Sequence, residues 1–442
     1  MSALTDLLLH GPQTANALRQ RLGVSQATFS RLVNAESHVI KAGAARATRY
    51  ALLRPVRQIR HFPLWQIDDS GKAWRFGELY PIWPQGSCLV ILNNGTAQWF
   101  DGVPWYLTDL RPQGFLGRAW GRRLAQQAGL PEDIRLWQEE DVLLALSQQP
   151  SENLGGWLVG EESYRRWFDT PLLQAITEAD KLSVYSELAS SALAGDIVGS
   201  SAGGEQPKFT CYAQTADGPA HVIVKFTPPL NNENSQRWAD LLQAEAIALN
   251  ILSEAQFPAS KARTLVAETR QTFLEVVRFD CVGAQGRKGI VSLEAVQSEY
   301  ASGPQNWPTV MAELLSQKAV EPATLRLTQC IWAFGRLIAN SDMHAGNLSF
   351  YLSDMPLKLA PVYDMLPMAF APNSAGSMRR EPIAPQIDPI VPQEVWLEML
   401  PLARRFWLEA SQNQGISESF RELSCAMASE LDAVEASVKR LA

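Results

Sequence analysis

The sequence has little of what membrane-spanning and disulfide-stabilised proteins require. Its five cysteines are scattered, odd in number and never spaced as metal ligands, so we predict reduced thiols. No apolar run approaches the roughly 18 residues that cross a bilayer, and the opening MSALTDLLLH has no basic stretch before its apolar residues. We therefore expect a cytoplasmic protein that makes no membrane contact.

Acidic residues are scarce at one end of the chain. Residues 1–60 hold nine Lys or Arg and two Asp or Glu. That segment carries a net charge of +7, against −7 for all 442 residues, which leaves −14 on the remainder. The chain is 46% apolar, enough for several buried cores. We expect a basic module joined to an acidic multidomain body.

The segment from Thr14 to Val33 has the pattern of two helices joined by a tight turn. Gly23 stands at the turn, Ser25 is a candidate N-cap, and apolar residues recur at helical spacing on both sides. Beyond it, HVIKAGAARATRYALL has two strand-like runs around a Gly/Ala tip, which is typical of a wing. We predict a winged helix-turn-helix domain over residues 1–60.

Six side chains of this domain are candidates for DNA contact, because cations bind phosphates and polar groups reach base edges. They are Gln26, Ser30 and Arg31 of the second helix and Lys41, Arg46 and Arg49 of the hairpin. The alternative is a three-helix packing module whose basic face is merely solvated. We favour DNA binding because pattern and charge agree. Helix-turn-helix proteins commonly bind DNA as dimers, so a homodimer is the matching expectation.

Residues 61–185 predict an α+β subdomain without obvious catalytic residues. Short apolar runs are broken by Gly and Asn, as in SCLVILNNGTAQWF, and helical spacing follows after Pro112. Residues 186–300 return to strand-like runs around one amphipathic helix, RWADLLQAEAIALNILSEA. Residues 301–442 are mainly helical, apart from a loop region that carries motifs.

Two of the four stretches with parts for phosphoryl transfer lie in residues 186–300. GSSAGGEQPKF contains Gly203 and Gly204, where backbone amides can approach phosphates, although a Gly-rich loop is more often a simple turn. In HVIVKF, Lys225 follows strand residues, and a buried ammonium needs an anion. Glu245, on the amphipathic helix, is a candidate partner, as in the lysine–glutamate pair of kinases. A structural ion pair is the alternative.

The other two stretches lie in the helical part. In IANSDMHAGNLSF, Asp342 and Asn347 are spaced like the aspartate and asparagine of a kinase catalytic loop. In LAPVYDMLP, Asp364 follows a short strand, where kinases place a metal-binding aspartate. An aspartate in such a turn is usually a cap or turn former. The order of all four stretches favours the kinase interpretation.

Together these stretches resemble the HipA family of kinases, the toxin component of HipA/HipB toxin–antitoxin modules, over residues 62–430. The match is densest in SAGGEQPKF, VIVKF, VRFD, SDMHAGN and PVYDM. The resemblance implies an α+β fold with a two-lobed, protein-kinase-like body. Residues 61–185 then correspond to the family's N-terminal subdomain, 186–300 to the kinase N-lobe and 301–442 to the C-lobe.

The resemblance also implies an ATP- and Mg²⁺-dependent serine/threonine protein kinase. Lys225 then contacts the ATP phosphates, Asp342 is catalytic, and Asn347 and Asp364 hold Mg²⁺. The segment Arg278, Phe279 and Asp280 looks like the hinge that holds adenine and ribose. Family members autophosphorylate a serine in the Gly-rich loop, which corresponds here to Ser201, with Ser200 as the neighbouring alternative.

The basic module departs from ordinary HipA proteins, which borrow DNA binding from a separate HipB antitoxin. This chain resembles a single-chain variant that carries its own DNA-binding module. Three roles for that module stay open: it replaces a HipB-like antitoxin, it regulates the kinase, or it places the kinase on the nucleoid. The protein substrate is not identified by the sequence. Two other functions also stay open: a transcription regulator whose kinase-like body senses nucleotide or binds a partner, and phosphotransfer to a small molecule.

Overall fold

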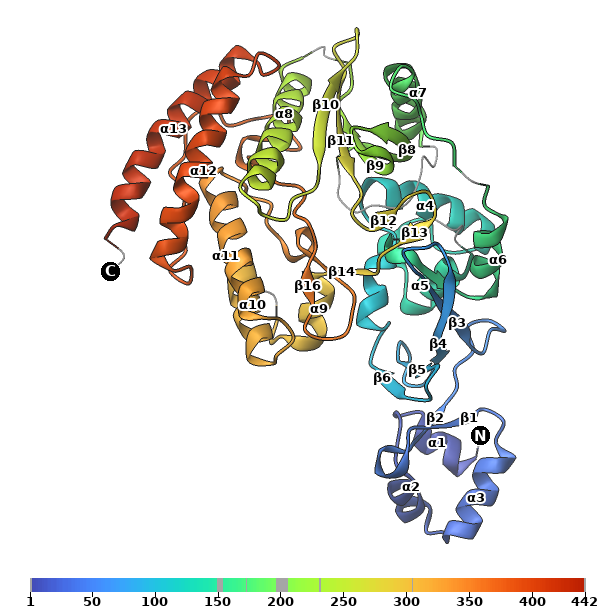
Figure 1. Ribbon diagram of the computed structural model, residues 1–442. Helices are drawn as coiled ribbons and strands as arrows, with labels where there is room; N and C mark the ends of the chain where they lie inside the picture. Colours follow the sequence, from blue (N-terminus) through green and yellow to red (C-terminus); the bar gives the residue numbers. More distant parts are fainter. Residues whose placement is uncertain are drawn as a thin grey trace. The chain divides into compact units, whose positions relative to one another are not determined.

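The computed structural model describes residues 2–148, 154–171, 173–195, 206–229, 232–303 and 305–440 (Figure 1). The chain divides into two compact units. The first is Met1–Gln113 with Gly117–Pro171, and the second is Gly114–Leu116 with Leu172–Ala442. Within the described residues, no helix is both long and apolar enough to cross a bilayer.

The first unit begins with three short helices and a β-hairpin. Gly23, at φ 65°, ends one helix in the left-handed conformation that glycine adopts without strain, and Ser25 caps the next by accepting from the Thr28 amide. Phe29 and Tyr50 meet edge to face in the small core. The elements are α1 (Ala3–Leu8), α2 (Ala15–Leu22), α3 (Gln26–Ala35), β1 (Val39–Ala42) and β2 (Arg49–Leu52).

The rest of the first unit is an antiparallel sheet with helices. The strand order is β6-β5-β4-β3-β7, and the last strand returns to the sheet after two helices. The buried tryptophan Trp157 packs against Phe76 and Tyr106. The elements are β3 (Phe62–Ile67), β4 (Ala73–Pro81), β5 (Cys88–Leu92), β6 (Ala97–Phe100), α4 (Gly114–Ala128), α5 (Glu139–Gln148), β7 (Trp157–Val159) and α6 (Glu161–Asp169).

The second unit opens with a four-stranded antiparallel sheet of order β10-β11-β9-β8. Side chains alternate between the two faces of the sheet along β9. Val222, Val224 and Phe226 enter a core with Tyr185 of α7, and the side chain of Lys225 lies on the other face. On that other face, residues of β11 pack against Leu242 of α8. The elements are α7 (Lys181–Ala194), β8 (Lys208–Thr215), β9 (Gly218–Phe226), α8 (Glu233–Glu254), β10 (Ala262–Val266) and β11 (Thr272–Val277).

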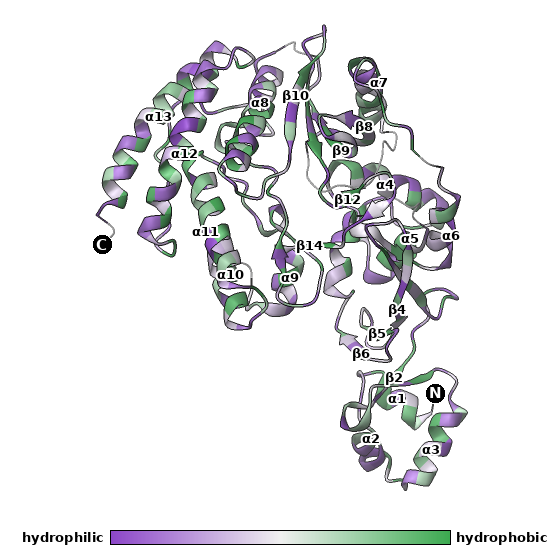
Figure 2. Ribbon diagram, viewed as in Figure 1, coloured by the Kyte–Doolittle hydropathy of each residue, from purple (hydrophilic) through white to green (hydrophobic). Residues whose placement is uncertain are grey.

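Helices make up most of the remainder of the second unit. Green and purple residues alternate along α11, α12 and α13 in Figure 2, as expected for helices that bury one face. Short strands separate them. The elements are β12 (Cys281–Val282), β13 (Gly286–Arg287), β14 (Ile290–Ser292), α9 (Leu293–Tyr300), α10 (Trp307–Ser316), α11 (Pro322–Leu337), β15 (Ser349–Tyr351), β16 (Lys358–Leu359), α12 (Gln393–Gln412) and α13 (Glu418–Val438).

Candidate active site

Lys225 lies on β9, an interior strand of the four-stranded sheet. It pairs in register with Lys208 of β8 on one side and Leu274 of β11 on the other. Its side chain is 7% exposed. An ammonium this deeply buried requires anionic partners, because removing it from water costs several kcal/mol.

Glu245 of α8 supplies one of those partners. The Lys225 Nζ lies 2.7 Å from both carboxylate oxygens of Glu245, whose side chain is fully buried. The helix that carries Glu245 begins with a capping box between Asn232 and Ser235, and its apolar residues pack on the sheet. The structure therefore contains the Lys225–Glu245 pair that the sequence predicted. The role of this pair in nucleotide binding stays a prediction.

Asp364 supplies the second anion, from a loop far away in the sequence. Lys225 Nζ donates to Asp364 Oδ1, and the Asp364 side chain is 25% exposed. The backbone of Asp364 has φ 52°, a left-handed conformation that costs a non-glycine residue free energy. Asn340 Nδ2 donates to the Asp364 carbonyl at 3.2 Å and helps to hold this conformation.

The three charged groups shift one another's pKa values. Burial lowers the pKa of Lys225, but the carboxylates of Asp364 and Glu245 outweigh it and leave the pKa raised. Burial also raises the pKa of Glu245, which Lys225 offsets only in part. For Asp364, Lys225 and Lys208 outweigh burial and lower the pKa. The site therefore favours an ionised Asp364 facing a charged lysine.

The loop after α11 carries Asp342 and Asn347. Asn340 Oδ1 accepts from the Asp342 amide at 3.0 Å, and Asn347 Nδ2 donates to the Asp342 carbonyl at 2.8 Å. Asn340 thus contacts both the Asp342 and the Asp364 segments. The Asp342 side chain itself lies on an exposed residue, and partial desolvation, reinforced by Asp364, raises the pKa of its carboxyl. His344 acts in the opposite direction.

Close packing fixes this loop against the end of α11. A Cβ on Gly335 would collide with Met343 and lie 3.3 Å from the sulfur of Met365. Met343 and Met365 directly follow Asp342 and Asp364 in the sequence. The absence of a side chain at Gly335 therefore lets both carboxylate-bearing segments approach the same turn of α11.

The oxygen donors of Asn347 and Asp364 fit a hard cation such as Mg²⁺. The Asn347 amide nitrogen donates to the Asp342 carbonyl, so the side-chain oxygen is the atom of Asn347 whose chemistry suits a cation. Within the described ranges, there is no group of three or more His, Cys, Asp or Glu that could hold a metal ion. This donor set suits Mg²⁺, which typically takes one or two carboxylates together with substrate phosphates.

The hinge candidates follow β11. Arg278 and Asp280 are buried and form a two-bond ion pair, at 2.7 and 3.0 Å. Phe279, between them, stacks on Tyr363 with ring centroids 5.8 Å apart. Arg278 and Asp280 therefore stabilise this segment through each other, and Phe279 connects it with the residue before Asp364. Its role as a nucleotide hinge stays a prediction.

The remaining predicted site residues fall into two groups. Ser200, Ser201, Gly203 and Gly204 lie outside the described residues. The six DNA-contact candidates belong to the first unit, where all of them are exposed; they are Gln26, Ser30, Arg31, Lys41, Arg46 and Arg49. Lys225, Glu245 and Asp364 meet in the second unit, and Asp342 and Asn347 share the adjoining loop.

Comparisons with known proteins agree with these motifs. The HipA-like C-terminal domain model matches residues 200–430, and the model of the YjjJ-like toxin middle domain matches residues 58–168. The sequence is 58% identical to the toxin YjjJ of Escherichia coli (strain K12) over 441 residues, which covers 100% of both chains. The chain belongs to the HipA-like toxin family.

A solved HipA structure supports the fold of this HipA-family chain. The complex of HipA, HipB and operator DNA from Shewanella oneidensis MR-1 contains a chain that matches with a TM-score of 0.53 and 15% identity. The match covers 85% of this chain and 97% of that one. The two-lobed, kinase-like α+β fold predicted from the sequence is confirmed. The helix-turn-helix assignment and the four domain boundaries stay predictions.

Sequence reasoning missed three residues at the site of this HipA-family chain. Lys208 is buried opposite Lys225, and its charge acts on both carboxyl groups that contact Lys225. Asn340 links the two motif-bearing loops, and the Tyr363 hydroxyl donates to the Gly346 carbonyl and contacts Ser349 Oγ. The signals were available: a second lysine on a neighbouring strand, and polar residues next to the motif aspartates.

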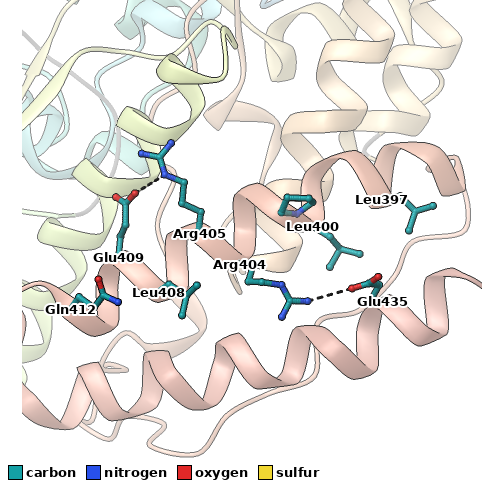
Figure 3. A pocket seen from close by; sticks show the side chains of 9 residues that line it. Leu397, Leu400, Arg404, Arg405, Leu408, Glu409, Gln412 and Glu435 are labelled. Carbon is teal, nitrogen blue, oxygen red and sulfur yellow. Dashed lines mark hydrogen bonds and ion pairs between the residues drawn. The ribbon is translucent and has the colours of Figure 1, made fainter.

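A groove along α12 and α13 lies apart from these residues. Figure 3 shows Leu397, Leu400 and Leu408 along it, with Arg404 directed at Glu435 and Arg405 at Glu409. Its lining includes none of the predicted site residues. Its arginines form ion pairs on the protein surface.

Proposed function

We propose that this HipA-family chain is an ATP- and Mg²⁺-dependent protein kinase that phosphorylates serine or threonine. The observation that carries the proposal is the buried Lys225, held between Glu245 of α8 and Asp364 of the motif loop. A purely structural ion pair needs one carboxylate. Two carboxylates from different elements, both bonded to one buried lysine, match the arrangement that positions phosphates and metal in kinases.

Each residue then has a distinct task. Lys225, oriented by Glu245, binds phosphate oxygens, and Asn347 with Asp364 holds the cation. Asp342 accepts the hydrogen bond of the acceptor hydroxyl and orients it for attack. Bound Mg²⁺–ATP supplies the phosphoryl group and the positive charge that stabilises its oxygens. Catalysis by the protein is positioning and electrostatics.

We also propose that residues 1–60 bind DNA, in the cytoplasm or on the nucleoid, through the six exposed DNA-contact candidates. The support is the charge of +7 on this segment and the exposure of all six side chains. The solved HipA–HipB structure from S. oneidensis includes operator DNA. A HipB-like antitoxin and a homodimer remain proposals of the same kind.

The deciding experiment is incubation of the purified chain with γ-labelled ATP and Mg²⁺, followed by mass spectrometry of residues 199–209. The wild type is compared with Asp342→Ala and Asp364→Ala, after phosphatase treatment of all three. We expect label on Ser201 or Ser200 in the wild type and none in either variant. Nucleotide binding without any transfer to this loop or to added protein would contradict a protein kinase.

The second candidate is a DNA-binding regulator whose kinase-like body senses nucleotide. The exposed basic residues of the first unit favour it. It differs from the kinase in one measurable way, since operator binding and repression would be unaffected by Asp342→Ala. A repressor assay with this variant, beside the labelling experiment, separates the two functions.

A further inference from the structure

The segment that follows the Asp364 loop is irregular and highly exposed. Residues 371–390 contain no helix or strand, and Arg379 and Arg380 are both exposed. In protein kinases the corresponding segment receives the protein acceptor and is commonly ordered by pairing of arginine with an added phosphate.

Arg237 of α8 donates hydrogen bonds to this segment. Its side chain is buried, at 4% exposure, and its Nη1 donates to the Phe370 and Arg379 carbonyls, both at 3.1 Å. These carbonyls lie at the start of the segment and beside its exposed arginines. One guanidinium nitrogen therefore ties together two points that are nine positions apart in the chain.

The guanidinium has a rigid support. It lies over the ring of Phe420 of α13, 4.9 Å from the centroid. Phe420 and Phe370 are fully buried and meet edge to face at 6.2 Å, and Phe370 also meets Trp407 of α12 at 6.1 Å. Arg237 is thus fixed on a packed aromatic cluster, and its hydrogen bonds to the segment have little freedom to shift.

The same helix carries Glu245. Arg237 and Glu245 are about two helical turns apart on α8, so one rigid element contacts both Lys225 and the segment. Asp240, between them, accepts from the amide and hydroxyl of Ser417 at the start of α13, at 2.8 and 2.6 Å. Asp240 therefore attaches α8 to α13.

We propose that Arg237 is a positioning residue for the protein acceptor: it fixes residues 371–380 against α8 so that the acceptor-binding surface is preformed without phosphorylation of the segment. The role in acceptor binding rests on the proposed kinase function. The fixing of the segment does not, because it depends only on the contacts of Arg237.

Trypsin cleavage after Arg379 or Arg380 measures the fixing directly. Arg237→Met keeps the apolar stem over Phe420 and removes the donors. We expect it to accelerate cleavage at these two sites by about tenfold or more, because the variant loses the charge-assisted hydrogen bonds to both the Phe370 and the Arg379 carbonyls. Arg237→Lys retains a charged donor and should restore at least part of the protection. If Arg237→Met does not fold, Arg237→Gln replaces it.

Two control variants separate this role from general packing. Asp240→Asn weakens the attachment of α8 to Ser417, and Glu233→Gln removes the exposed ion pair with Arg380 at 2.6 Å. Glu233→Gln should leave cleavage within about twofold of the wild type, since exposed ion pairs contribute little. Asp240→Asn perturbs α8 at its contact with α13 and keeps the hydrogen bonds of Arg237, so it should accelerate cleavage less than Arg237→Met. Unchanged cleavage in folded Arg237→Met would overturn the proposal, and so would equal acceleration in Asp240→Asn.

The kinetic arm uses a synthetic peptide with the sequence of residues 196–210 as acceptor. We expect Arg237→Met to raise KM for the peptide by about tenfold, with the affinity for a non-hydrolysable ATP analogue within about twofold. A loss of nucleotide affinity equal to the loss in peptide KM would overturn acceptor positioning. If the wild type does not phosphorylate the peptide or itself, the proposed function fails, and the trypsin rates still decide whether Arg237 fixes the segment.

Discussion

The ammonium of Lys225 lies 2.7 Å from both carboxylate oxygens of Glu245, and it also donates to Asp364. A single cation therefore joins strand β9, helix α8 and the loop that follows Val362. Because two carboxylates share one ammonium, removal of any member changes the protonation of the others.

Lys225→Met should abolish phosphoryl transfer and lower the free energy of unfolding by roughly 3 kcal/mol, because Glu245 loses its buried partner. The pKa of Glu245 is already raised by burial, so this carboxyl should take up a proton in the variant. The double variant Lys225→Met/Glu245→Gln should then recover part of the lost stability. Urea unfolding of the four proteins of the cycle measures this; strictly additive losses would contradict the shared pair.

Asp342→Asn and Asp364→Asn should fail in different ways. Asp342→Asn should lower kcat by about 10²–10⁴-fold, the range for loss of a positioned base, and leave nucleotide affinity unchanged. Asp364→Asn should weaken binding of an ATP analogue chiefly when Mg²⁺ is present. Calorimetry with and without Mg²⁺, beside single-turnover transfer, distinguishes them. Equal loss of nucleotide affinity in both variants would argue against these assignments.

Tyr363→Phe should slow transfer without changing DNA binding. The lost hydroxyl contacts the Gly346 carbonyl at 2.8 Å and Ser349 Oγ at 2.7 Å, and both flank Asn347. Removing it leaves polar groups without this partner, at a cost of about 1–2 kcal/mol. Tyr351→Phe, on the same aromatic cluster, is the matched control. A kcat unaffected by Tyr363→Phe would show that the hydroxyl does not position the loop.

His221 should make the protein less stable as the pH falls from 6.5 to 4. Burial lowers the pKa of His221 to about 4 from the ordinary 6.5, and its Nε2 lies 2.8 Å from the Ala284 carbonyl. Between these pH values the unfolded chain binds a proton that the folded chain does not. The free energy of unfolding therefore decreases as the pH is lowered through this window, by roughly 3 kcal/mol in total.

The variant His221→Gln tests this assignment, because its amide retains a donor for Ala284. The slope of stability against pH over this window should decrease by about one proton. Identical slopes in the wild type and His221→Gln would exclude His221 as the group that titrates.

Two substitutions in the first unit should change DNA binding in different ways. Lys41→Ala should weaken binding to all sequences and reduce the salt dependence of log K by about 1, as expected for one lost phosphate contact. Gln26→Ala should instead reduce discrimination between DNA sequences and leave the salt dependence unchanged. Fluorescence anisotropy over a range of salt measures both. Lys72→Ala, on an exposed turn outside residues 1–60, should have no effect.

Local patterns predicted much of the candidate site. Strand alternation placed Lys225 in a sheet, helical spacing placed Glu245 on the neighbouring helix, and the structure pairs them. The motif order also predicted the kinase-like body that the family match confirms. The loop with Gly203 and Gly204 lies outside the described residues, so that prediction is untested.

The amino-acid sequence by itself determined the elements, the motif residues and the family, because periodicity, capping and motif spacing are local properties of the chain. Only the tertiary structure decided which distant groups meet. Lys225 and Asp364 are 139 positions apart, and Arg237 and Arg379 are 142 apart. Such contacts depend on how α8 packs on the sheet and on α13, and on the space that Gly335 leaves beside α11. No local pattern contains that information, since it arises from packing many side chains at once.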